Sequence, residues 1–132
     1  MKPVSQVEGH VFPSGMDMPI VSVREPLADI AERCGLIVEQ WEEDGLGQAS
    51  GMFVRLPSGR VMLLRELQQA RKYLGEEGPT VHADVGDLAE FGVEPLVAEV
   101  LQSLGLASDT VTRVASNDAQ RIAAGLLKRL RS

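Results

Sequence analysis

Two residues of a type that often takes part in catalysis stand close together in the chain, His82 and Asp84. A histidine oriented by a carboxylate is a common general base for activating a nucleophile. The segment around them, PTVHA at 79–83, has the composition of a short strand, in which alternate positions merely share a face. No serine or cysteine nucleophile is recognisable beside the pair. We therefore predict no catalytic residue and interpret His82 as a structural histidine at a strand end.

Glycines at positions 45, 47 and 51 follow a predicted strand, so their spacing must be compared with the dinucleotide-binding fingerprint. That fingerprint needs a helix directly after the glycines, because the helix N-terminus meets the pyrophosphate. Residues 52–61 have β character and a hairpin turn instead. The glycines therefore indicate a strand connection, and we predict no cofactor.

The sequence also predicts neither a metal site nor a reactive thiol. Cys34 is the only cysteine and cannot form an internal disulfide, while His10 and His82 are too far apart for a recognisable ligand spacing. Cys34 falls on the apolar stripe at the C-terminal end of a predicted helix, where the negative end of the helix dipole disfavours a thiolate. We predict a packed, unreactive cysteine, no metal site and a reducing, cytoplasmic location.

Charge is the most unusual property of the sequence. The 132 residues carry a net charge of −6, and no Lys or Arg occurs between Tyr73 and Thr112. Nucleic acids are bound chiefly through Lys and Arg contacts to phosphates, so they are poor partners for this composition. No run of apolar residues is long enough for a membrane span. We expect neither a nucleic-acid nor a membrane partner, and we predict a basic protein instead.

The segment EQWEEDG, residues 39–45, places the only tryptophan among four carboxylates. Alternation along a strand puts Glu39, Trp41 and Glu43 on one face. An exposed aromatic ring with a charged rim is typical of an interface anchor. The alternative is that the ring folds back over the following hairpin. The predicted partner-binding residues are Glu39, Trp41, Glu42, Glu43 and Asp44.

We expect one hydrophobic core to hold these segments in place, and an apolar content of 44% is sufficient to build it. Residues 1–17 lack periodicity and predict a flexible N-terminal arm, so the single domain should cover 18–132. Helical signals begin with the capping-box pair Ser22 and Glu25, and further helices are expected over 64–74, from Asp84 to Gly92, over 94–104 and after Ser116. Strands are expected over 36–43, in two runs within 51–64, and over 79–83 and 110–115.

The predicted fold class is α+β. We expect an antiparallel sheet of three to five strands with a central meander at 36–64, and three to four helices packed mainly on one face. The predicted function is a non-enzymatic protein-binding domain, concretely an acidic immunity protein or antitoxin of bacterial type that neutralises a basic nuclease toxin. One alternative is a small enzyme or ligand-binding domain with a pocket between sheet and helices, using His82, Asp84 or Arg55. The other is a homo-oligomeric or secretion-associated subunit.

Overall fold

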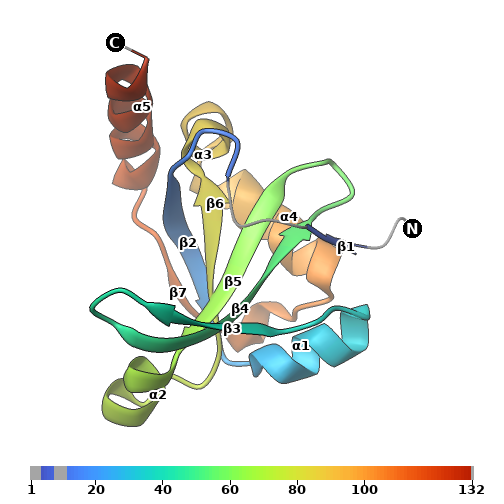
Figure 1. The fold of residues 1–132 in the computed structure, drawn as a ribbon. Helices are drawn as coiled ribbons and strands as arrows, with labels where there is room; N and C mark the ends of the chain where they lie inside the picture. The colour runs from blue at the N-terminus through green and yellow to red at the C-terminus, as the bar shows by residue number, and fades with distance from the viewer. Residues whose placement is uncertain (1–3, 8–11, 132) are drawn as a thin grey trace.

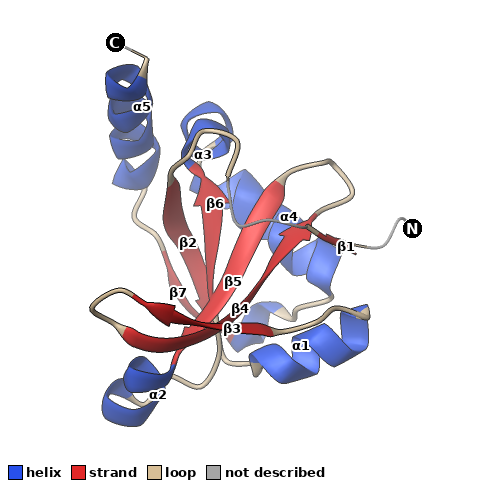
Figure 2. Ribbon diagram, viewed as in Figure 1, coloured by secondary structure: helices blue, strands red, loops and turns tan. Residues whose placement is uncertain are grey.

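The computed structural model describes residues 4–7 and 12–131, which form an α+β fold with one antiparallel sheet and five α-helices (Figures 1 and 2). The strands are β1 (Ser5–Gln6), β2 (Asp17–Val23), β3 (Glu39–Glu43), β4 (Gly47–Arg55), β5 (Val61–Leu67), β6 (Thr80–Asp84) and β7 (Val111–Val114). The helices are α1 (Leu27–Cys34), α2 (Gln68–Leu74), α3 (Val85–Phe91), α4 (Val93–Leu104) and α5 (Asp118–Leu130), with a short 3₁₀ turn η1 (Ser108–Thr110).

The strand order is β1-β4-β5-β6-β2-β7, and β3 pairs with β4 beside that path. The predicted meander is confirmed, because β3, β4 and β5 follow one another as antiparallel neighbours. The expected three to five strands are too few, since the described residues form seven. The largest error concerns β2. Ser22 lies within this strand rather than capping a helix, and α1 begins only at Leu27.

The main core lies between one face of the sheet and the helices. On β5, Met62 and Leu64 are fully buried in this core, and they alternate with Leu63 and Arg65 on the opposite face. Helices α1, α3 and α4 supply the other side, and α4 lies behind the central strands in Figure 1. Helix α5 projects from the body beside α3. Helices α1, α3 and α4 therefore cover one face, and the five α-helices of the described residues exceed the three to four that were predicted.

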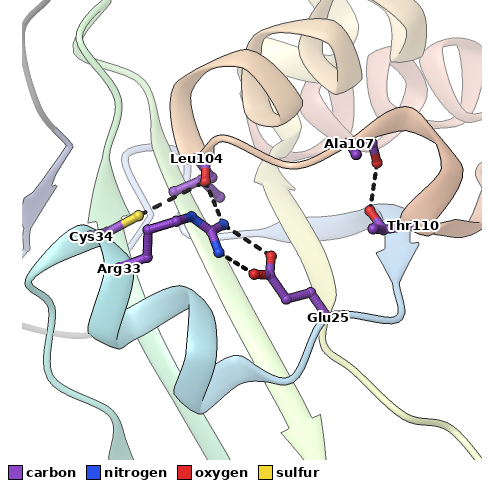
Figure 3. A network of polar contacts seen from close by, with 6 residues as sticks. All are labelled: Glu25, Arg33, Cys34, Leu104, Ala107 and Thr110. Carbon is purple, nitrogen blue, oxygen red and sulfur yellow. Dashed lines mark hydrogen bonds and ion pairs between the residues drawn. The ribbon is translucent and has the colours of Figure 1, made fainter.

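A polar network fixes the end of α1 against the end of α4 (Figure 3). The guanidinium of Arg33 donates to both carboxylate oxygens of Glu25 and, over 2.8 Å, to the carbonyl of Leu104. The Cys34 thiol contacts the same carbonyl at 3.9 Å. Cys34 is partly buried against the core, and this burial raises the pKa of its thiol. The cysteine therefore belongs to a packing contact between two helix ends.

Part of the predicted N-terminal arm lies against the sheet. Ser5 and Gln6 pair with β4, and the Gln6 side chain donates to the Ile37 carbonyl and accepts from the Ile37 amide. Val4 and Phe12 are buried. The remainder of the arm prediction, at 1–3 and 8–11, lies outside the described residues.

Candidate functional site on the open face of the sheet

The sheet face that carries Arg65 is turned away from α1, α3 and α4, and we call it the open face. Cross-strand register places Arg65 opposite Gly51 on one side and Thr80 on the other. Thr80 in turn faces Ser22, and Ser22 faces Arg113. A row of polar side chains therefore crosses β5, β6, β2 and β7. Helix α2 lies at one end of this face, at the bottom of Figure 1.

Two adjoining cavities hollow the open face, and Arg65 lines both. Cavity I has a volume of about 340 Å³ and includes the polar residues Ser22, Thr80, His82 and Arg113 in its wall. Cavity II has a volume of about 430 Å³ and is lined by Phe12, Gly15, Asp17, Trp41, Glu43, Phe53, Leu63 and Arg65. Both volumes fall within the range of roughly 300–1,000 Å³ that is usual for ligand pockets.

Trp41 folds back onto the sheet and still lines cavity II. A Cβ atom added at Gly51 would lie 2.5 Å from Cη2 of Trp41, so the indole occupies the space that the glycine leaves. The ring packs against a second apolar cluster that contains Phe12, Phe53, Val61 and Leu63. Of the two alternatives for Trp41, the folded-back position is the one observed. The indole is only partly buried, however, which leaves some of it available in the cavity wall.

The predicted partner-binding residues fall into two groups. Glu39, Glu42 and Asp44 are exposed on or next to β3, whereas Glu43 is half-buried. Oε1 of Glu43 accepts a hydrogen bond of 2.6 Å from Nη1 of Arg65. The five residues therefore do not form one uniform acidic surface: three carboxylates lie outside, while Trp41 and Glu43 face cavity II. Their role in binding stays a prediction.

Asp17 is the residue of this site that the sequence analysis missed. It lies on β2, which the sequence analysis failed to predict, and its Oδ2 is 2.9 Å from Nδ1 of His82. This close contact with the imidazole lowers the pKa of the Asp17 carboxyl, partial burial opposes the shift, and the charges of His82 and Arg65 add to it. Apolar residues at alternate positions, Met18 with Ile20 and Val21 with Val23, were the signal that could have located this strand.

His82 itself is buried, and no described residue forms a well-aligned hydrogen bond with either of its ring nitrogens. We therefore treat the contact of Nδ1 with Asp17 as mainly electrostatic. Nearby, the hydroxyls of Ser22 and Thr80 lie 2.9 Å apart and bond to each other. Within the described part of the chain, no hydrogen bond connects either hydroxyl to His82, so a base and an activated nucleophile are not assembled here.

Asp84 has a structural role. Its carboxylate caps α3 by accepting from the amides of Gly86 (2.8 Å) and Asp87 (3.4 Å). The same carboxylate accepts from the amide of Ser14 at 2.8 Å and from its hydroxyl at 2.7 Å. Arg55 donates to the Gly59 carbonyl at 3.2 Å in the neighbouring turn. Of the three residues suggested for a ligand pocket, only His82 lines cavity I or cavity II.

The described residues contain no group of three or more His, Cys, Asp or Glu side chains placed to hold a metal ion. Over the same ranges, no helix has the length and apolar character needed to cross a bilayer. Comparison of the chain with protein-family models, curated proteins and solved structures found no match. The chemistry of the open face is therefore argued from its own side chains.

Proposed function

We propose that the protein is a non-enzymatic binding domain that captures a basic protein. The observation that carries this proposal is the lining of cavity II, where Trp41 and Glu43 of the acidic segment meet Asp17 and the rings of Phe12 and Phe53. Aromatic rings together with carboxylates are suited to a cationic side chain, because cation–π and Coulomb attraction act on the same charge. Cavity II would hold an anchoring Arg or Lys of the partner.

The charges around cavity II support the same partner class. Glu39, Glu42 and Asp44 are exposed near its Trp41 wall, where they would attract a positively charged surface during approach. Inside the cavity, Glu43 already has a cationic neighbour in Arg65, and Asp17 is in contact with the imidazole of His82. An incoming cation therefore shares these carboxylates. We expect the exposed carboxylates to govern the association rate and the aromatic rings to govern the dissociation rate.

In its concrete form, the proposal is an immunity protein or antitoxin that covers the cationic site of a nuclease-type toxin in the cytoplasm. An acidic protein surface can occupy a site that otherwise receives phosphates. Support comes from the net charge of −6 and from the recess for a cationic side chain on the open face.

The test uses an octa-arginine peptide as the basic probe and Trp41, the only tryptophan, as the fluorescent reporter. The variant Glu39→Lys/Glu42→Lys/Asp44→Lys should slow association by at least about tenfold at low salt. The matched control Glu32→Lys/Glu90→Lys/Glu94→Lys changes the net charge equally at exposed positions on α1, α3 and α4. An equal effect of the two triple variants, or no change in Trp41 fluorescence, would contradict the proposal.

A second candidate function is the binding of a small molecule. The observation that favours it is cavity I, whose wall combines a buried histidine and two arginines with apolar side chains. This candidate differs from the sequence-based alternative in position, because cavity I lies on the open face rather than between the sheet and the main helices.

A further inference from the structure

We infer that cavity I is a binding site for a small anionic molecule with a compact apolar body. This site is separate from the proposed recess for a basic side chain and shares only Arg65 with it. The inference about cavity I does not depend on the proposed basic partner.

The first observation is the state of His82. Its side chain is 9% exposed, Nδ1 is turned to Asp17, and Nε2 is enclosed without a hydrogen-bond partner among the described residues. Buried polar atoms in folded proteins nearly always have a partner, so an exception calls for a reason. Because His82 is one of the residues that line cavity I, a polar atom of a bound molecule is a candidate for this partner.

The second observation is the distribution of charge in the wall. Guanidinium groups stand at both ends of the polar row, Arg65 on β5 and Arg113 on β7, with the hydroxyls of Thr80 and Ser22 between them. Arg65 is held by Glu43, but Arg113 has only a loose contact of 4.0 Å with Glu76, and its side chain is 77% exposed. Arg113 is therefore free to turn toward a ligand. Among the described residues of this wall, Glu76 is the only carboxylate beside two arginines, so hydrogen-bond donors predominate.

The third observation concerns the apolar part of the wall. Leu67, Ala70 and Leu74, at the end of β5 and on α2, face the cavity together with Ala115 beyond β7. Leu74 is 73% exposed, although it is a large aliphatic side chain at the mouth of a cavity. An apolar ligand body in contact with Leu74 and Ala70 would remove such surface from water. The volume of about 340 Å³ limits that body to a small molecule.

These features predict which ligand chemistry is accepted. A carboxylate offers two acceptors in the planar arrangement that a guanidinium recognises, and one of the two hydroxyls can add a further donor. A neutral molecule of the same shape would leave the arginines without a counter-charge. We therefore expect the charge of the head group to decide binding, with the apolar body adding affinity.

The experiment compares octanoate with its neutral analogue octanamide, using amide and imidazole chemical shifts of the full chain. Octanoate should shift the signals of His82, Thr80 and Ser22, and octanamide should bind at least about tenfold more weakly. The variant Arg113→Gln should weaken octanoate binding by about tenfold. The matched control Arg121→Gln should not, because Arg121 is 80% exposed beside Asp118 on α5 and lies outside cavity I.

A second variant, Ala70→Phe, fills the cavity from α2 and should abolish octanoate binding without removing any charge. Its folded state is checked by the dispersion of the same spectrum. The inference is overturned if octanoate gives no saturable shifts up to about 10 mM, which corresponds to a binding free energy weaker than roughly −3 kcal/mol. It is also overturned if octanamide binds equally well, or if Arg113→Gln and Arg121→Gln behave alike. A response to octa-arginine alone would leave the proposed function standing and reject this site.

Discussion

Nη1 of Arg65 lies 2.6 Å from Oε1 of Glu43, and this ion pair stands where cavity I meets cavity II. Arg65 comes from a central strand and Glu43 from the end of β3, so the pair holds the acidic hairpin against the open face. The pair also separates Glu43 from the neighbouring carboxylates. Glu43 has a cationic partner inside the site, while Glu42 and Asp44 are exposed at the surface. For that reason the charge-reversal variant proposed above leaves Glu43 unchanged.

The close packing of Trp41 on Gly51 gives the first prediction. A methyl group at position 51 would meet the indole at 2.5 Å and the Leu64 carbonyl at 2.7 Å, and the carbonyl belongs to the backbone of β5. Gly51→Ala should therefore lower the free energy of unfolding by about 1–3 kcal/mol, as expected for overpacking. It should also change the emission of Trp41. Urea denaturation followed by fluorescence measures both effects.

The matched control is Gly125→Ala in α5, where an added Cβ meets no atom within 4 Å. Alanine is a better helix former than glycine, so this variant should raise the free energy of unfolding by about 0.5–1 kcal/mol. If Gly51→Ala proved as harmless as Gly125→Ala, the position of Trp41 over Gly51 would be wrong.

The contact between Asp17 and His82 predicts a dependence of stability on pH. The pKa of Asp17 is lowered in the folded protein, so ionised Asp17 stabilises the fold above its ordinary pKa of 3.8, and this stabilisation is lost as the pH falls through the lowered value. Asp17→Asn should therefore be less stable than the wild type at about pH 7, and the difference should shrink below the ordinary pKa of the carboxyl. Thermal unfolding across this pH range is the measurement.

Asp87 provides a control of opposite sign. Burial raises its pKa, and the nearby Asp84 charge adds to the shift, so ionisation of Asp87 opposes folding as the pH rises. Asp87→Asn should stabilise the protein near neutral pH and have less effect in acid. If both variants changed the stability of the protein in the same direction near neutral pH, this assignment would be contradicted.

The Asp84 carboxylate connects the N-terminal segment to α3 through four hydrogen bonds, two from Ser14 and two from the first turn of the helix. Asp84→Ala removes a helix cap and leaves partly buried donors without an acceptor, so it should lower the free energy of unfolding measured by urea denaturation by about 2–4 kcal/mol. Ser14→Ala keeps the amide bond to Asp84 but removes the hydroxyl bond to Asp84 and the hydroxyl's contacts with the Met16 backbone, and it should lower the free energy of unfolding by about 1 kcal/mol. Equal losses for the two variants would show that the cap of α3 contributes little.

Cys34 should react slowly with thiol reagents. Burial raises the pKa of its thiol, and the reactive thiolate is therefore scarce at neutral pH. We expect alkylation by iodoacetamide to be several-fold slower in the folded protein than in the same protein unfolded in urea. Equal rates in the two states would mean that the contact with the Leu104 carbonyl does not protect the sulfur.

The sequence predicts those parts of the fold that depend on local signals. The hairpin turn between β4 and β5 is one, and the end of α4 is another, where Gly105 has a φ of 65° and the Leu106 amide bonds to the Leu101 carbonyl as a Schellman cap requires. Asp84 as the start of α3 was also predictable, because a carboxylate is a common N-cap.

The sequence could not predict features that depend on distant pairings. Ser22 and Glu25 have the spacing of a capping box, yet β2 pairs with β6 and β7 and so places Ser22 in the sheet. Cross-strand pairing overrides a local propensity of this kind. The neighbours of His82 and Trp41 could not be predicted for the same reason. Strand pairing in the sheet brings Asp17 next to His82 and Gly51 next to Trp41. Apolar spacing along α5 is likewise a poor guide to burial, because Ile122 is about half exposed there.

The central claim is that the open face receives a cationic group between Trp41 and the carboxylates of cavity II. The most direct measurement is a chemical-shift map of the labelled full chain titrated with octa-arginine. We predict saturable shifts at the Trp41 indole and at Asp17, Phe12 and Phe53, which weaken as salt screens the charges. Shifts restricted to exposed carboxylates on α1, α3 and α4, with the Trp41 indole unchanged, would contradict the claim.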